Sequence, residues 1–451
     1  MACTTIIVGK KLTKDGSIIH AHLEDMGVNA VGKLWRVESC THKETLALSI
    51  PYVEIPQIDK THAYWASGNA DIVAGLGVKH INMPYDNVLV GYNERGVVMS
   101  CNWCYSKEKN FLEHGIRRYA MRQLLLERAN TAVHGVELIG GWIDKYGQAD
   151  WGGLQYQISD PMEAWIVETT SSQWIARKIR DEEIFVAANR FTIGTQFDSA
   201  SAGLVPFALE KGWFDGKEPL HFADTYTLLQ RRNSPYDTDR ESRVLFLLEP
   251  QKGIITPVNV LRVLQDRYDG TNLFHIPDDE VEIWEGEAEK TGCPRPICTN
   301  LAQSFFVTKH TFENQKDETV MFFGLGTPGY SGIIPLYKEC GEVPPPYSRE
   351  ADVDMQAWRL FRKMQKLTDK YFSTFSAEVQ SFWEERNAST ILRVEKSNIC
   401  DSRKRALDTF KTSYDNLNLA RKFLKKLVAH DERCGKRDKQ GQKGLSFGEE
   451  T

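Results

Sequence analysis

Short apolar runs rich in β-branched residues dominate the first hundred residues of the chain. One such run covers residues 3–8, and the turn signal Asp15-Gly16 separates it from a second run over residues 18–23. Two β-rich runs joined by an Asp-Gly turn predict a β-hairpin. Runs of the same kind recur at residues 88–92 and 96–100. We therefore expect the N-terminal part of the chain to form core strands of a packed sheet.

Farther along, the spacing of the apolar positions changes several times. Between residues 115 and 146 they recur at helical spacing with one break, which predicts two helices. Strand patterns return in four consecutive segments of 154–188, which predict an antiparallel meander. Helical segments at 222–232 and 257–268 precede another β-rich part at 297–337. Runs of strands that alternate with runs of helices favour a layered α+β sandwich over a parallel βαβ sheet.

The composition changes beyond three consecutive prolines near the end of this pattern. Over residues 352–430 glycine and proline are absent, and aromatic, leucine and charged residues alternate as in amphipathic helices. Residues 431–451 are rich in Lys, Gln, Gly and Glu and are predicted to be a disordered tail. We therefore divide the chain into a domain over 3–347, a helical extension packed on it over 350–430, and this tail.

Composition and charge narrow the class of protein. Hydrophobic residues make up 41% of the 451 residues and charged residues 26%, so the chain can bury a large core. The net charge of −5 indicates neither nucleic acid nor a membrane as a partner. No run approaches the roughly 18 apolar residues of a membrane span, and the N-terminus lacks a secretory pattern. The nine cysteines show no dense disulfide framework, so we expect free thiols and a cytoplasmic protein.

Cys3, at the start of the first apolar run, has two interpretations. A free cysteine is usually a small buried hydrophobe, but at the tip of a buried strand it can also be a nucleophile. The string Cys3–Lys10, followed by Asp15–Ser17 and Glu24-Asp25, resembles the opening of the cysteine dipeptidase family of N-terminal-nucleophile hydrolases, which are related to penicillin V acylases and bile-salt hydrolases. Five further strings match the family in the same order: Gly91–Val97, Asp160–Glu168, Ala188–Phe191, Arg267–Thr271 and Ile334–Tyr337.

The resemblance implies a four-layer αββα fold, in which two antiparallel sheets lie between helical layers. It also implies that the mature enzyme begins with Cys3, whose free α-amino group, with a pKa of about 7.7–8.0, acts as general base for the thiol. The thiol would then form a thioester with the substrate. This arrangement requires removal of Met1 and Ala2, by a cleavage that could be autocatalytic, and the base is missing if Ala2 is retained.

Five more site residues follow from the resemblance. Asp25 is similar to the carboxylate that contacts the amino group of the nucleophile. His22 stands where these families commonly carry an arginine; it is expected at the substrate side and is only partly protonated near neutral pH. Asn102 and Asn189 resemble side chains that bind the oxyanion, and Arg243 resembles an arginine that supports the nucleophile region.

Other motifs give no comparable signal. Cys101 and Cys104 form a C-x-x-C pair, but no second Cys or His pair follows at zinc spacing. The glycine pairs at 75–77 and 324–326 lack the third glycine and helix start of a dinucleotide site. We therefore expect no metal and no cofactor.

Three functions remain open at this stage. The first is a cysteine-dependent amide hydrolase, foremost a dipeptidase acting on a small-molecule substrate. The second is an acylase-like hydrolase of N-acyl or conjugated amino acids. The third is a non-catalytic, secernin-like binding protein. The helices of the extension could also provide a contact for a homo-oligomer.

Overall fold

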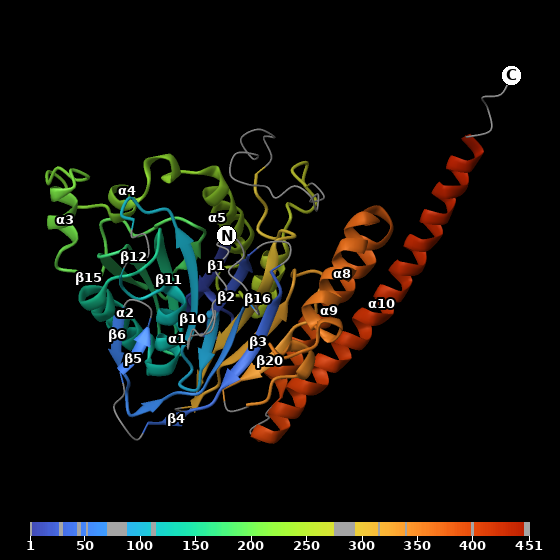
Figure 1. Cartoon of the computed structure of the whole chain (residues 1–451), viewed down its shortest axis with the longest axis horizontal. Coiled ribbons are helices and arrows are strands. Elements are labelled where there is room, and N and C mark those ends of the chain that lie inside the picture. The colour runs from blue at the N-terminus through green and yellow to red at the C-terminus, as the bar shows by residue number, and fades with distance from the viewer. Residues whose placement is uncertain are drawn as a thin grey trace.

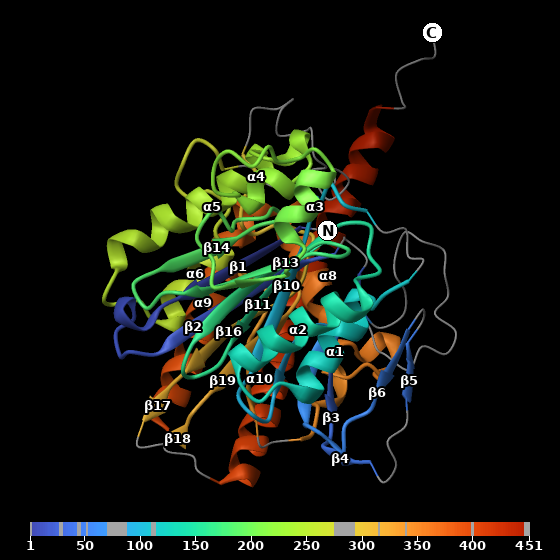
Figure 2. The same cartoon turned by 90° about the vertical axis from the view of Figure 1, so that its left-hand side faces the viewer.

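Two antiparallel sheets lie face to face in this protein and carry helices on their outer faces (Figure 1 and Figure 2). The computed structural model describes residues 2–26, 30–42, 47–50, 53–69, 88–109, 114–274, 294–313, 316–338, 341–397 and 401–445. The first sheet has six strands, in the spatial order β14 (Ile184–Ala187), β1 (Ala2–Val8), β2 (Ile18–Asp25), β16 (Ala302–His310), β19 (Val320–Leu325) and β20 (Ile334–Tyr337).

The second sheet has eight strands among the described residues. Their spatial order is β15 (Ser199–Ala200), β13 (Trp174–Ile179), β12 (Ala164–Thr169), β11 (Gly153–Ser159), β10 (Val98–Cys104), β9 (Val88–Asn93), β8 (Tyr64–Asn69) and β3 (Gly32–Val37). Three small ribbons complete the strands: β4 (Cys40–Thr41) with β7 (Lys60–Thr61), β5 (Ala47–Ile50) with β6 (Val53–Pro56), and β17 (Phe312–Glu313) with β18 (Lys316–Asp317).

Helices cover both outer faces of the sandwich. The eight-stranded sheet is covered by α1 (Arg118–Arg128) and α2 (Ala132–Tyr146), and the six-stranded sheet by α5 (Pro235–Leu248), α6 (Pro257–Gln265), α8 (Ala357–Lys370), α9 (Phe372–Lys396) and α10 (Ser402–Leu445). Two short helices, α3 (Leu204–Glu210) and α4 (Phe222–Tyr226), lie at one end. Single 3₁₀ turns are η1 (Lys10–Leu12), η2 (Leu229–Arg231), η3 (Glu249–Gln251), η4 (Pro345–Tyr347) and η5 (Val353–Met355). The observed architecture is thus the αββα sandwich that the sequence predicts.

Local sequence accounts for the central hairpin. The apolar residues of β1 and β2 alternate in direction, so that Ile6 and Val8 pack under α5 and α6 while Thr5 faces the other sheet. Gly16 adopts a φ of 75° in the connection, a conformation that a residue with a Cβ rarely takes. The two strands pair in antiparallel register.

Two sequence predictions differ from the structure. The fourth strand of the expected meander, β14, leaves its neighbours and pairs with β1 in the other sheet. It buries apolar side chains on both faces there, Phe185 between the sheets and Val186 under the helices. The tail predicted for 431–451 is instead helical as far as Leu445. This part of α10 extends beyond the body of the fold (Figure 1). Lys, Arg and Gln are good helix formers, so a polar segment can extend an existing helix. The remaining residues of the tail lie outside the described part of the chain.

The helices of the C-terminal extension belong to the sandwich. Side chains of α8, α9 and α10 share one apolar cluster with Phe323 and Leu336 of the six-stranded sheet. The extension thus forms much of the outer layer over β19 and β20. Within the described residues, no helix combines the length and the apolar content needed to span a membrane.

The space between the two sheets contains buried polar side chains as well as apolar ones. His20 lies 2.9 Å from Ser100 Oγ through Nε2 and 2.7 Å from Ser159 Oγ through Nδ1. Ser159 in turn lies 2.9 Å from His310 Nε2. Burial lowers the pKa of both histidines, that of His310 to about 4. A hydrogen-bonded polar layer therefore runs between the sheets, and Cys3 lies at one end of it.

Candidate active site

Cys3 is the second residue of β1, near the end of the six-stranded sheet, and lies directly opposite Glu24 of the neighbouring strand β2. Residues directly opposite each other in an antiparallel pair project on the same face, so the two side chains meet. The thiol donates to Glu24 Oε1 at 3.3 Å. Both side chains are buried, with 2% of Cys3 exposed.

His22 joins this pair from the same face of β2, two residues before Glu24. Its Nε2 lies 3.0 Å from Glu24 Oε2, and its Nδ1 lies 2.8 Å from Thr5 Oγ1. The hydroxyl of Thr5 donates to Asn102 Oδ1 at 2.9 Å and therefore accepts from Nδ1 of His22. His22 is only 1% exposed, and its two ring nitrogens contact Glu24 and Thr5.

The charges around the thiol oppose its ionisation. Burial raises the pKa of Cys3 well above its ordinary value, and the negative charges of Glu24 and Asp25 raise it further. For Glu24, burial raises the pKa, but the hydrogen bond and charge of His22 outweigh it and lower the pKa overall. The thiol is thus the proton donor of the cluster, and forming a thiolate requires a base that can take this proton.

The backbone of Cys3 is held by a separate set of side chains. Its N–H donates to Asn189 Oδ1 at 3.0 Å, and its carbonyl oxygen accepts from Arg240 Nη1 at 2.7 Å. Arg240 also donates to Asn189 Oδ1 at 3.0 Å and to Asp237 Oδ1 at 2.8 Å. Asp237 in addition accepts the backbone N–H of Asn189 at 3.0 Å. Arg240 and Asp237 are completely buried, so this clamp is shielded from solvent.

Asp25 borders the same end of the sheet. Its Oδ2 accepts from Arg295 Nη2 in an ion pair whose two side chains are each 1% exposed. Its Oδ1 is buried and has no hydrogen-bond partner among the described residues. Burial raises the pKa of Asp25 although the charge of Arg295 lowers it. One carboxylate oxygen is therefore available for a further donor near Cys3.

Asn102 connects the two sheets. Its Nδ2 donates to the carbonyl oxygens of Ala188 at 2.7 Å and Ala187 at 3.1 Å, while its Oδ1 accepts from Thr5. Both amide hydrogens are thus engaged by backbone carbonyls. The oxyanion role expected of Asn102 finds no free donor in this arrangement, whereas Asn189 contacts the nitrogen of Cys3 itself.

The arginine that supports the nucleophile is not the expected one. Arg243 lies one turn farther along α5 and forms a two-point ion pair with Asp266, at 2.8 Å and 2.7 Å. Arg240 is the residue of this helix that contacts Cys3. The prediction for Arg243 is corrected accordingly: a helical shift of three residues moves the guanidinium to a different partner.

Sequence reasoning missed several members of the site. Glu24 is detectable, because His20, His22 and Glu24 are polar at a period of two within an apolar strand, which marks one common face. Arg240 and Arg295 had no such signal, since the first belongs to a helix with several arginines and the second to an irregular segment.

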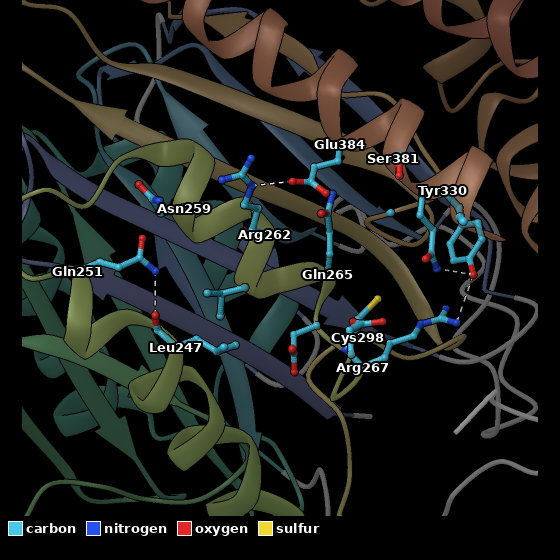
Figure 3. A pocket seen from close by; sticks show the side chains of 16 residues that line it. Leu247, Gln251, Asn259, Arg262, Gln265, Arg267, Cys298, Tyr330, Ser381 and Glu384 are labelled. Carbon is cyan, nitrogen blue, oxygen red and sulfur yellow. Dashed lines mark hydrogen bonds and ion pairs between the residues drawn. The ribbon is translucent and has the colours of Figure 1, made fainter. Parts of the chain in front are cut away.

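A cavity of about 460 Å³ lies on the outer side of the six-stranded sheet, between α6 and α9 (Figure 3). Cys298, Arg267 and Glu384 are among its lining residues, and Cys3 is not. Burial raises the pKa of Cys298 to about 12, and Asp25 is one of the charges that contribute. Neither Asp25 nor Cys3 is among the described residues that line this cavity.

The sequence of this chain matches a known protein family and several known proteins. The model of a family described as peptidase family C69 matches residues 2–254 and 221–385. A probable dipeptidase of Latilactobacillus sakei is 31% identical over 201 residues, which span 43% of this chain and 40% of that relative. Probable dipeptidase B of Streptococcus pyogenes serotype M1 is 23% identical over 372 residues, which span 74% of this chain and 71% of the relative.

Solved structures of similar shape were also found. Penicillin V acylase from Agrobacterium tumefaciens has a TM-score of 0.40 and 12% identity, covering 74% of this chain and 85% of that one. A mutant of conjugated bile acid hydrolase from Clostridium perfringens has a TM-score of 0.37 and 16% identity. The match covers 71% of this chain and 92% of that one. The family match spans most of the chain and confirms the resemblance seen in the sequence motifs, so this protein belongs to peptidase family C69.

Proposed function

We propose that this protein is a cysteine-dependent dipeptidase, which hydrolyses a small peptide through a thioester on Cys3. The observation that carries the proposal is the set of hydrogen bonds that hold Cys3. Its thiol faces Glu24, and its N–H and carbonyl are both bound by buried side chains, Asn189 and Arg240. A structural cysteine in a strand needs no such support. The names of the two relatives, both probable dipeptidases, point to the same substrate class.

The base in this proposal is the α-amino group that cleavage of the bond between Ala2 and Cys3 would release. An α-amino group has a pKa of about 7.7–8.0, so a large share of it is unprotonated near neutral pH. The Cys3 nitrogen lies within hydrogen-bond distance of Asn189 Oδ1, which would orient the amine. The unpartnered Oδ1 of Asp25 supplies a further acceptor for the ammonium ion formed later.

The reaction then has two halves. The amine takes the thiol proton, the sulfur attacks the carbonyl carbon of the scissile bond, and the C–N bond breaks as the ammonium ion returns a proton to the leaving amine. Water next attacks the thioester, which releases the carboxylic acid and restores the thiol. Arg240 and Asp237 act as positioning residues, since they bind the backbone of Cys3 and Asn189 rather than the reacting atoms.

His22 has a supporting part in this mechanism. Its Nε2 is hydrogen-bonded to the carboxylate that borders the thiol. When protonated, it offsets the negative charge of Glu24, which otherwise opposes formation of the thiolate. An imidazole can lose this charge as the pH rises, whereas an arginine keeps it.

The cleavage that exposes Cys3 is proposed to be autocatalytic, with the same thiol attacking the carbonyl of Ala2. A cytoplasmic location is part of the proposal as well. It is supported by the free thiols of the described cysteines, which suit a reducing compartment.

Intact mass and turnover together test the proposal. Purified protein is expected to begin at Cys3 and to hydrolyse unblocked dipeptides, and Cys3→Ser is expected to lower this turnover by several orders of magnitude. Protein that keeps Ala2 and hydrolyses no amide would point instead to the non-catalytic alternative. Hydrolysis confined to N-acyl amino acids would point to an acylase-like enzyme.

A further inference from the structure

The side chains around the Cys3 thiol also have the composition of a metal site. Cys3, His22 and Glu24 each offer one ligand atom, and these atoms all lie within 4.8 Å of one another. We propose that the three residues bind a thiophilic divalent cation, with zinc as the expected ion. The ion would inhibit the catalytic site described above, and only this effect on catalysis rests on the proposed function.

The donor set suits zinc in both chemistry and spacing. Zinc binds thiolate, imidazole and carboxylate, with bonds of about 2.3 Å to sulfur and about 2.0–2.2 Å to nitrogen and oxygen. In a tetrahedral site such bonds place neighbouring ligand atoms roughly 3.3–3.7 Å apart. Here Sγ of Cys3 lies 3.3 Å from one oxygen of Glu24, and Nε2 of His22 lies 3.0 Å from the other. Small side-chain adjustments would therefore bring all three around one ion.

The backbone fixes these three side chains before any ion binds. His22 and Glu24 share one face of β2, and Cys3 stands directly opposite Glu24 on β1. Thr5, opposite His22, accepts a hydrogen bond from Nδ1 and so leaves Nε2 as the ligand atom. Metal-binding histidines are usually held through their other ring nitrogen in this way.

The charges of the ligands themselves match a divalent ion. Asp25 is paired with Arg295, and Asp237 with Arg240. Once Cys3 loses its proton, the thiolate and Glu24 together carry two negative charges, which a divalent cation matches. Binding would displace the thiol proton to solvent, with no change of oxidation state. The sulfur lone pair would then belong to the metal and could not attack a carbonyl carbon.

Cobalt(II) is a suitable probe, because it occupies zinc sites and absorbs visible light. We expect one equivalent of Co²⁺ to bind the full-length protein and to give a sulfur-to-cobalt charge-transfer band, which excess Zn²⁺ abolishes. His22→Gln and Glu24→Gln should each weaken Co²⁺ binding by at least about tenfold. Cys3→Ser should lose the charge-transfer band. Cys40→Ser, which removes an exposed cysteine outside the site, should keep it.

Two results would overturn the site: a charge-transfer band that survives Cys3→Ser, or an unchanged Co²⁺ affinity in both His22→Gln and Glu24→Gln. Thermal unfolding of each variant identifies any that fails to fold, and the remaining ligand variant then decides the result. Peptide hydrolysis is assayed separately. Cobalt binding by a protein that hydrolyses no peptide supports the metal site and contradicts the proposed function, whereas hydrolysis by a protein without the cobalt band contradicts the metal site alone.

Discussion

Arg240 Nη1 donates to the carbonyl oxygen of Cys3 at 2.7 Å, across 237 positions of the sequence. Its second terminal nitrogen donates to Asn189 Oδ1, the same atom that accepts the N–H of Cys3. Both backbone polar groups of the nucleophile are thus fixed by one guanidinium and one amide. Cross-strand pairing with Glu24 places the thiol beside the carboxylate of that residue.

Replacement of this arginine tests the clamp. Hydrogen bonds from a charged group contribute about 1.5–3 kcal/mol each, so Arg240→Gln is expected to lower kcat/KM roughly 10- to 100-fold. Arg240→Lys should recover part of the loss, since it keeps the charge beside Asp237. Steady-state kinetics with a dipeptide substrate measure both variants.

Arg243→Gln is the matched control on the same helix. It breaks an ion pair with Asp266 that is mostly shielded from solvent and has no bond to Cys3, so its effect on kcat/KM should be clearly the smaller. A larger effect for Arg243→Gln than for Arg240→Gln would restore the assignment made from the sequence. Thermal unfolding is measured for both, because Arg240→Gln leaves Asp237 buried without its partner.

The charge of Glu24 is expected to control the ionisation of the thiol. Burial, Glu24 and Asp25 all raise the pKa of Cys3, so removal of one negative charge lowers that pKa. In Glu24→Gln a larger fraction of Cys3 should therefore be thiolate at any given pH. Ultraviolet absorbance of the thiolate, titrated with and without Cys3→Ser, measures the difference. An unchanged or raised pKa in Glu24→Gln would contradict this electrostatic account.

Asn102→Ala separates a structural role from an oxyanion role. The variant would leave the carbonyl oxygens of Ala187 and Ala188 without this donor, and each buried unsatisfied group costs about 1–3 kcal/mol. We therefore expect a lower thermal midpoint and a moderate effect on kcat. Loss of an oxyanion donor would instead lower kcat by about 100- to 1000-fold at unchanged stability.

The buried histidines of the polar layer between the sheets predict how the free energy of unfolding depends on pH. Burial lowers the pKa of His310 to about 4 and that of His20 in the same direction, whereas an unfolded histidine titrates near 6.5. Between these values the unfolded chain binds more protons than the native protein, so stability falls as the pH decreases from about 6.5 to about 4. For His310 the loss is of the order of 3 kcal/mol.

Urea unfolding over this pH range measures the effect. His310→Gln should flatten the dependence, after correction for its lower stability at neutral pH. Stability that is constant between pH 4 and 6.5 would show that both histidines bind protons equally in the native and unfolded states.

Part of the site could be predicted from local sequence. The Asp15-Gly16 signal and the apolar runs on either side of it predict a hairpin of β1 and β2. The connection spans residues 9–17 and includes η1, so the register that places Cys3 opposite Glu24 is set by the structure. The period of two also puts His22 on the same face as Glu24. The shared face of His22 and Glu24 follows from spacing within one strand, whereas their position beside Cys3 depends on how the two strands pair.

The rest depends on contacts between distant segments. Arg240 and Arg243 occupy the same helix three residues apart, and only the packing of α5 against β1 decides which one meets Cys3. The pairing of Asp25 with Arg295 spans 270 positions and joins a strand to an irregular segment.

The order of the strands in the sheets also depends on contacts between distant segments. Each strand of 154–188 was recognisable by its own residues, but β14 pairs with β1 of the other sheet and buries apolar side chains on both of its faces. The sequence by itself thus determined most of the elements and the hairpin, and it singled out Cys3 as the candidate nucleophile. Tertiary structure alone decided which buried charges surround that nucleophile, because burial and charge pairing depend on segments that local patterns do not connect.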